Sequence, residues 1–141
     1  MRYWDSSAII PILISEPRSA ELRELSDDGG QLAAWWGTTV ECTSAIARRE
    51  RAGHLGPDDS ADALGTLGKV ADHWIEVPPS AELRNDARRL VRVHDLRAAD
   101  AFQLAAAQVA SDGRPETLEF VTLDDRLALA ARREGFPVLP G

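Results

Sequence analysis

Predicted strands and helices alternate along this chain, and their order constrains the fold more than any other feature of the sequence. Short runs that favour strands cover residues 1–5, 31–36, 73–77, 118–123 and 136–139. Between them, apolar residues recur at helical spacing over residues 8–14, 18–26, 40–52, 57–71, 80–94, 98–110 and 124–134. Such alternation is typical of a mostly parallel sheet. The sequence therefore predicts an α/β fold with a central sheet of four to five strands and helices on both faces.

The composition fits a single domain over residues 1–141. The chain is 44% hydrophobic and 28% charged, close to the average for globular proteins. Cys42 is the only cysteine, which excludes an internal disulfide and a cysteine-based zinc or redox site and suits a reducing cytosol. The apolar stretch from Ala8 to Ile14 is far shorter than the ~20 residues that span a bilayer. We expect a cytoplasmic protein that does not enter a membrane.

The net charge of −7 opposes binding to nucleic acid unless cations cluster locally or a metal ion adds positive charge. One such cluster is predicted on helix 80–94, where Arg84, Arg88 and Arg92 recur every four residues and Arg97 follows. These arginines form either a surface that follows phosphates or an ordinary solvated helix face, and the sequence leaves both interpretations open.

Four acidic residues are expected where a parallel sheet gathers ligands, outside the carboxyl ends of its strands. Asp5 follows the first predicted strand and Asp124 follows the fourth, whereas Glu41 and Asp100 lie in the first turns of two helices. Carboxylates that share one pocket repel each other unless a cation compensates them, and hard ions such as Mg²⁺ or Mn²⁺ prefer oxygen ligands. This pattern predicts a divalent-metal site built from the four acids.

Each acid also has a structural explanation that involves no chemistry. An Asp at a helix start caps the helix and interacts favourably with its dipole, and Glu41 follows Thr38 at the spacing of a capping box. Asp100 is the hardest to explain in this way, because it lies among small apolar residues, where an unpaired carboxylate is costly. For Glu41 and Asp100 both explanations stay open.

Four short motifs, in order along the whole chain, resemble those of PIN-domain ribonucleases of the VapC toxin type. They are Asp5-Ser6-Ser7-Ala8, the segment around Glu41, Leu96 to Ala107, and Val121 to Leu127, and Gly135 to Val138 closes the chain as in this family. The resemblance implies a PIN-like three-layer fold and an endoribonuclease toxin of a type II toxin-antitoxin pair. It further implies Mg²⁺ or Mn²⁺ as cofactor, RNA as substrate, a VapB-type antitoxin as partner, and a homodimer.

The resemblance also implies a set of site residues. Four acids correspond to metal-binding positions, the last of them supporting the metal directly or through water: Asp5, Glu41, Asp100 and Asp124. The Thr-x-Asp spacing from Thr122 selects Asp124, which leaves Asp125 as a solvent-facing helix cap. Supporting roles fall on Ser6 and Thr122, and RNA contacts on Arg92 and Arg97. The histidines are not assigned to the site, and His94 is expected to stabilise a helix end through the dipole.

Two other functions fit parts of the same pattern. A PIN-like module without catalysis would only bind a partner. Trp35 and Trp36 are either exposed residues of an antitoxin interface, as the resemblance implies, or part of the core and strand packing. A receiver or phosphatase-like domain would use Asp5 for Mg²⁺ or phosphate. It also requires a lysine near a strand end, and the only lysine, Lys69, lies inside a predicted helix.

Overall fold

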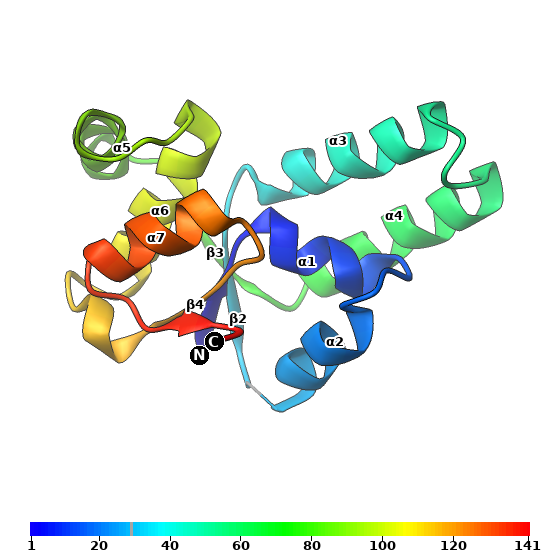
Figure 1. Ribbon diagram of the computed structural model, residues 1–141, viewed down its shortest axis with the longest axis horizontal. Coiled ribbons are helices and arrows are strands. Elements are labelled where there is room, and N and C mark those ends of the chain that lie inside the picture. Colours follow the sequence, from blue (N-terminus) through cyan, green and yellow to red (C-terminus); the bar gives the residue numbers. More distant parts are fainter. Residues whose placement is uncertain (29) are drawn as a thin grey trace.

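A computed structural model describes residues 1–28 and 30–141, and these residues form a five-stranded sheet (Figure 1). Its strands are β1 (Arg2–Trp4), β2 (Leu32–Trp35), β3 (Ile75–Val77), β4 (Glu119–Val121) and β5 (Val138–Leu139). They pair in the order β3-β2-β1-β4-β5, and every pair is parallel. The predicted α/β fold with a parallel central sheet is confirmed.

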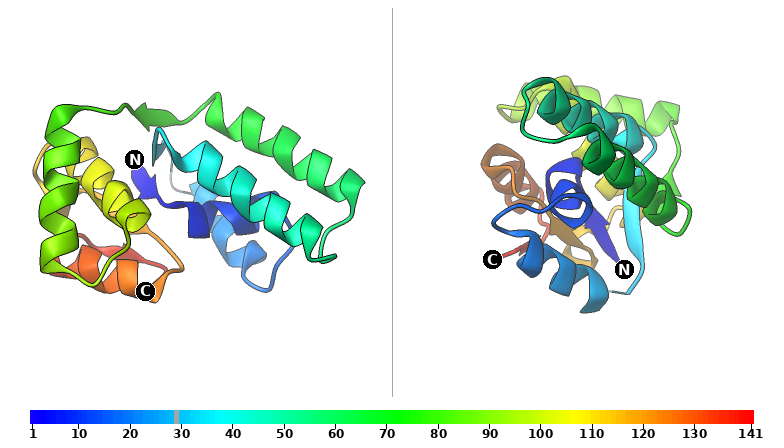
Figure 2. Two further views of the ribbon diagram at one scale, coloured as in Figure 1. Left: turned by 90° about the horizontal axis from the view of Figure 1, so that it is seen from above. Right: turned by 90° about the vertical axis from the view of Figure 1, so that its right-hand side faces the viewer.

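Helices connect the strands and cover both faces of the sheet. They are α1 (Ser6–Leu13), α2 (Ser19–Asp28), α3 (Thr38–Arg51), α4 (Pro57–Ala71), α5 (Ala81–Val93), α6 (Ala98–Ala110) and α7 (Asp125–Arg133), with a short 3-10 helix at Pro115–Thr117. One group, α1 to α4, lies on one side of the strands, and α5 to α7 lie on the other (Figures 1 and 2). The result is the three-layer arrangement expected from the sequence.

Successive residues of each strand enter different cores, because side chains on a strand point alternately to its two faces. Tyr3 and Phe120 pack with α5, α6 and α7, and their rings stack with centroids 5.2 Å apart. Trp4 and Val121 pack with the helices of the other layer. Burial of a large apolar side chain contributes roughly 1.5–3 kcal/mol, so both faces of the sheet are stabilised. In β1, β2 and β4 this two-sided burial explains the runs of consecutive apolar residues at the strand ends, whereas in β3, at the edge of the sheet, Ile75 and Glu76 are exposed.

Side-chain hydroxyls accept backbone hydrogen bonds just beyond the carboxyl ends of β1 and β4. The backbone N–H of Leu123 donates to Ser7 Oγ (2.9 Å), and the N–H of Asp124 donates to Thr122 Oγ1 (3.0 Å). These bonds take the place of backbone hydrogen bonds between strands. The strand β4 therefore ends at Val121, two residues before its predicted end. The first helix, α1, begins at Ser6, two residues earlier than predicted, and the Asp5 carbonyl accepts from the N–H groups of Ala8 and Ile9.

Only one of the two tryptophans considered for an interface is exposed. Trp35 is 8% exposed, and its ring stacks on Phe102 with centroids 5.5 Å apart. Of the two interpretations of Trp35, core packing is confirmed and an exposed interface residue is wrong, because α6 packs over that face of β2. Trp36, one residue further along the chain, is 56% exposed.

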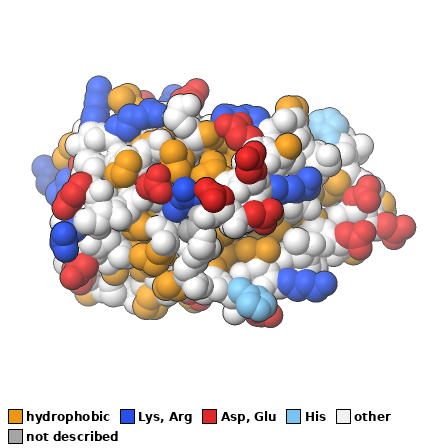
Figure 3. All heavy atoms as spheres, turned by 90° about the horizontal axis from the view of Figure 1, so that it is seen from below, with side chains coloured by type: hydrophobic (Ala, Val, Ile, Leu, Met, Phe, Trp, Pro, Cys, Tyr) orange, Lys and Arg blue, Asp and Glu red, His pale blue; other side chains and the backbone are white. Residues whose placement is uncertain are grey.

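Charges of both signs are mixed on the face that carries α2, where acidic and arginine side chains lie beside each other (Figure 3). Arg18 and Glu21, for example, form an exposed ion pair at 3.0 Å. Among residues 1–28 and 30–141, no helix combines the length and the apolar character needed to cross a bilayer.

The packing of α7 can be tested with two leucines of the same helix. Leu127 is fully buried and Leu129 is 47% exposed. Leu127→Ala should lower the free energy of unfolding by about 2–5 kcal/mol, because it removes buried methyl groups and leaves a cavity. Leu129→Ala should change it by less than about 0.5 kcal/mol. Urea denaturation followed by circular dichroism measures both, and equal losses would contradict this packing.

Candidate active site

The four predicted acids line one cavity of about 870 Å³ at the carboxyl edge of the sheet. Each comes from a different element: Asp5 from the end of β1, Glu41 from α3, Asp100 from α6, and Asp124 from the residue that precedes α7. Because β1 is the central strand and pairs with β4 in parallel, the two aspartates that follow these strands reach the same edge. The helices α3 and α6 begin on either side of this edge.

Asp5 is the most deeply buried of the four acids, with 3% of its surface exposed. It occupies the N-cap position of α1, but its carboxylate makes no capping bond to the helix. Instead the hydroxyl of Ser7 donates to Asp5 Oδ1 at 2.8 Å. Burial, followed by the charges of Asp124 and Glu41, raises the pKa of Asp5 to about 7, although hydroxyls of Ser7 and Thr122 offset part of the rise. Capping therefore does not explain this residue.

Glu41 is held by two side chains from other elements. Ser6 Oγ donates to Glu41 Oε1 at 3.0 Å, and Gln103 Nε2 donates to Glu41 Oε2 at 3.1 Å. Burial raises the pKa of Glu41, with a contribution from the charge of Asp100. Both carboxylate oxygens are thus bound across the site. The capping-box alternative is set aside, because Thr38 uses its hydroxyl to accept from Gln103 instead (3.1 Å).

Asp100 lies half-buried in the first turn of α6 and faces the same cavity. Burial raises the pKa of Asp100, and the nearby charge of Asp124 raises it further. The backbone N–H of Arg97 and the charges of Arg97 and Arg126 act in the opposite direction. The nearby N–H group and arginine charges therefore offset only part of the cost of ionising the half-buried Asp100 carboxyl group.

The cap of α7 is Asp124 and not Asp125. The Oδ1 atom of Asp124 accepts from the N–H of Leu127 at 3.0 Å, so Asp124 caps α7. Asp125, the first residue of α7, is exposed at the rim of the cavity. The prediction that Asp125 is the cap is wrong, because the Thr122 hydroxyl bonds to the Asp124 N–H and turns Asp124 into the N-cap position. Asp124 lines the cavity as well.

Gln103 was not predicted as part of the site, yet it connects three of its residues. It is fully buried on α6, and Tyr3 Oη donates to Gln103 Oε1 at 2.6 Å. This bond orients the amide, so that its Nε2 group donates to Thr38 and Glu41. The sequence signal was available: Gln103 is a polar residue inside an Ala-rich helix, and a buried amide needs partners.

Arginines border the acidic cavity on two sides. Arg48 and Arg49 come from α3, and Arg97 and Arg126 come from the starts of α6 and α7. Arg49 is paired with Glu16 at 2.9 Å, also at the cavity wall. Arg92 is exposed on α5 and is not among the lining residues, so Arg97 and Arg92 occupy different surfaces.

Lys69 lies away from the four acids. It is exposed near the end of α4 and borders a separate depression beside Gln31 and His73. A receiver or phosphatase-like site would need this lysine beside the acids, so the geometry disfavours that alternative.

Comparison with known proteins identifies the fold. No protein-family model and no curated protein sequence matches the chain. Among solved structures, VapC20 from Mycobacterium tuberculosis, a toxin that cleaves the sarcin-ricin loop, matches with a TM-score of 0.71 at 15% identity over 96% of each chain. FitAcB from Neisseria gonorrhoeae matches with a TM-score of 0.66 at 15% identity, over 98% of this chain and 96% of that one. A toxin-antitoxin complex from Klebsiella pneumoniae gives 0.59 at 21% identity, over 99% and 96%.

The chain has the fold of VapC20 and FitAcB, which confirms the VapC-like PIN fold expected from the sequence. The sequence identities are low, so the similarity concerns the fold, and the chemistry of the cavity depends on this chain's own residues. Its acids lie at the edge of the sheet where open parallel sheets bind ligands.

The chemistry of the donor set in this cavity fits a divalent cation. All four acids offer carboxylate oxygens, the ligands that Mg²⁺ and Mn²⁺ prefer, and their mutual repulsion is what a cation would relieve. As the side chains stand, no three Asp, Glu, His or Cys residues within the described part of the chain form a group that could hold a metal ion. Each carboxylate is instead bound by a neighbouring hydroxyl, amide or backbone N–H.

The raised pKa of Asp5 predicts how the stability of the metal-free protein depends on pH, measured in the presence of a chelator. The pKa rises from 3.8 to about 7, so between these values the folded state binds the extra proton. Stability contributed by the protonated form is therefore present below pH 4 and is lost as the pH rises through 7. The loss is at most about 4 kcal/mol, taking 1.36 kcal/mol per pKa unit.

Asp5→Asn should remove most of this dependence and make the protein more stable than wild type at pH 8. Thermal melts in EDTA from pH 4 to pH 8 measure the effect, with Asp62→Asn on the exposed face of α4 as the control. A lower melting temperature of Asp5→Asn at pH 8 would contradict the picture of a strained buried charge.

Gln103→Leu should destabilise the protein by about 1–3 kcal/mol, because it leaves polar groups of Tyr3, Thr38 and Glu41 without a partner. Tyr3→Phe removes only the bond to Gln103 Oε1 and should cost less. Denaturant titration of both variants checks this order. A reversed order would show that the amide does not organise the site.

Proposed function

We propose that this protein is a metal-dependent endoribonuclease and the toxin of a type II toxin-antitoxin pair. The observation that carries the proposal is the meeting of Asp5, Glu41, Asp100 and Asp124 in one cavity of a VapC-like fold. The matched structures include a toxin that cleaves the sarcin-ricin loop and a toxin-antitoxin complex, which supports the same class for this chain.

In the proposed reaction Asp5, Glu41 and Asp100 would hold Mg²⁺ or Mn²⁺, and Asp124 would support it directly or through water. When bound, such an ion lowers the pKa of a water molecule and stabilises charge on a phosphodiester. Ser6 and Gln103 keep the Glu41 carboxylate turned across the cavity, and Ser7 does the same for Asp5. Thr122 Oγ1 lies 3.2 Å from Ser7 Oγ and so helps to orient the Ser7 hydroxyl.

The arginines at the rim supply the positive charge that a polyanion needs on a chain of net charge −7. Arg97 is the proposed RNA contact nearest the acids, since it borders the same cavity as Asp100. Arg92 is the second proposed contact, further along the basic side of α5. The acids alone would repel RNA, so binding requires these cations, the metal ion, or both.

Asp5→Asn and Asp100→Asn should each abolish cleavage of RNA in Mg²⁺, because either change removes a proposed metal ligand. Calorimetric titration with Mn²⁺ should show the affinity falling in both variants. Asp125→Asn is the matched control, since Asp125 lies at the rim one residue from Asp124 and should keep near wild-type activity. Wild-type protein that binds no Mn²⁺ and cleaves no RNA would favour the alternative, a PIN-like module that only binds a partner.

Arg97→Ala should weaken RNA binding in EDTA and reduce the slope of log affinity against log salt by about 0.7, the value for one single-strand phosphate contact. The same titration of Arg92→Ala tests the second proposed contact. Arg133→Ala, at the far end of α7, should leave the slope unchanged. Equal slopes for wild type and Arg97→Ala would remove Arg97 from the RNA surface.

A VapB-type antitoxin and a second copy of the chain are the proposed protein partners. Two exposed apolar residues belong to this region: Val40 of α3 lines the cavity, and Trp36 lies two residues before the start of α3. An antitoxin that covers this rim would block access to the acids.

A further inference from the structure

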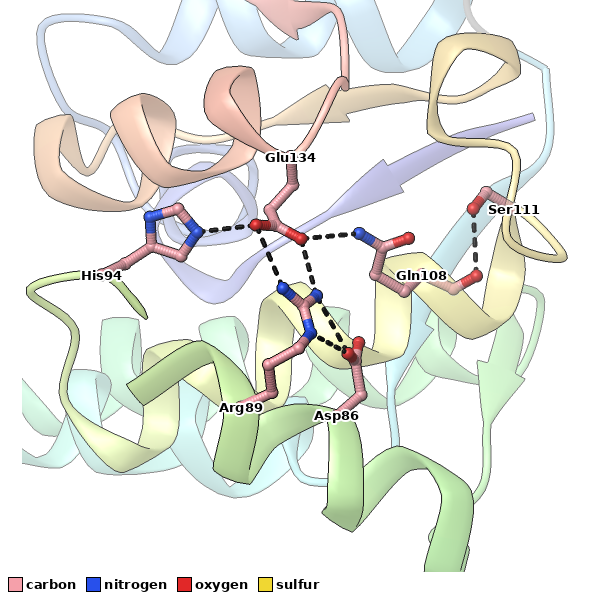
Figure 4. Close-up of polar contacts among 6 residues, drawn as sticks. All are labelled: Asp86, Arg89, His94, Gln108, Ser111 and Glu134. Atoms are coloured by element: carbon pink, nitrogen blue, oxygen red, sulfur yellow. Dashed lines mark hydrogen bonds and ion pairs between the residues drawn. The ribbon is translucent and has the colours of Figure 1, made fainter. Parts of the chain in front are cut away.

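A second polar cluster connects the C-terminal parts of α5, α6 and α7. Glu134, directly after α7, accepts from His94 Nε2 at 2.7 Å, from Arg89 Nη2 at 2.6 Å and from Gln108 Nε2 at 3.3 Å. Figure 4 shows the Glu134 carboxylate between His94 and Gln108, with Arg89 reaching it from α5. These partners come from the end of α5, from α5 itself and from α6.

The two central side chains of the cluster are largely withdrawn from solvent: His94 and Glu134 are 5% and 12% exposed, whereas Arg89 is 46% exposed. Burial alone would raise the pKa of Glu134, but bonds from Arg89 and His94 outweigh it and lower that pKa. Asp86 shares Arg89 with Glu134, and its Oδ2 atom is buried without a partner among the described residues. Of the three donors to Glu134, His94 is the one that leads directly into the link before α6.

His94 connects this cluster to the proposed active site. It is the C-cap residue of α5 and begins the short link, residues 94–97, that leads into α6. The N–H of Leu96 donates to the His94 carbonyl at 3.0 Å, and the N–H of Ala101 donates to the Arg97 carbonyl at 3.0 Å. Arg97 and Asp100 follow His94 by three and six residues and line the acidic cavity.

The start of α7 carries Asp124, whose N–H donates to the hydroxyl of Thr122 two residues earlier, and that hydroxyl lies 3.2 Å from Ser7 Oγ of α1. At the end of α7, Glu134 is bonded to His94. A movement of the 94–97 link relative to α7 would change the position of Asp100 relative to Asp124. Two contacts between the link and α7 oppose this movement: the buried bond of His94 with Glu134 at 2.7 Å, and the exposed pair of Asp95 with Arg126 at 3.8 Å. Exposed pairs contribute little, so the buried bond is the stronger restraint.

We propose that Glu134 and His94 are positioning residues: their contact holds the 94–97 link against α7 and so fixes Asp100 and Arg97 at the cavity. The role rests on the proposed function, since it matters for catalysis only if these acids hold a metal ion. The contact itself acts on the backbone whether or not a metal ion is bound.

His94→Leu and His94→Gln provide a matched pair. Leucine removes the donor to Glu134, whereas the glutamine amide places an N–H group close to the position of Nε2. In His94→Leu, hydrogen exchange of the peptide covering residues 95–101 should become about tenfold faster in EDTA. Mn²⁺ affinity, measured by calorimetry, should weaken by about tenfold. His94→Gln should return both measurements to within about twofold of wild type.

Glu119→Gln is the control for general destabilisation. It weakens the 2.9 Å contact of Arg2 with Glu119 at the opposite edge of the sheet. It should lower the melting temperature without changing exchange over 95–101. Unchanged exchange in His94→Leu, or equal changes in Glu119→Gln, would overturn the positioning role. If wild-type protein binds no Mn²⁺, the proposed function fails, and the exchange measurement still decides whether the contact holds the link.

Discussion

Parallel pairing of β1 with both of its neighbours is the constraint on which this structure depends. Because β1 is central and its neighbours run in the same direction, every segment that leaves their carboxyl ends starts from one edge of the sheet. Asp5 and Asp124 leave β1 and β4 there, and α3 and α6 bring Glu41 and Asp100 to the same place. Residues 119 positions apart in the chain become neighbours for this reason.

The site is built at a cost in stability. Burial and like charges raise the pKa of Asp5, Glu41 and Asp100, which means that the ionised forms are disfavoured in the folded protein. A network of neutral donors, chiefly from Ser6, Ser7 and Gln103, offsets part of the cost without supplying a positive charge. Such an arrangement is typical of sites that sacrifice stability for function.

The same fold is shared with proteins that are only 15% to 21% identical to this chain. Many different apolar sequences can fill the layers of such a fold, whereas the acids at the edge of the sheet contribute to the site rather than to the packing. The proposed function therefore depends on the residues that line the cavity. The fold shows only that the cavity lies where such sheets bind ligands.

The sequence by itself determined the strands, the helices and the acids that follow the strands, because periodicity and capping are local properties. It also placed Arg97 next to Asp100. It did not determine whether Asp124 or Asp125 caps α7, that Trp35 is covered by α6, or that Gln103 connects Tyr3 with Glu41. His94 was expected to act on its own helix end, and it bonds instead to Glu134, 40 residues away. Each of these depends on contacts between elements distant in the chain, and only the packed sheet and its two helical layers bring those elements together.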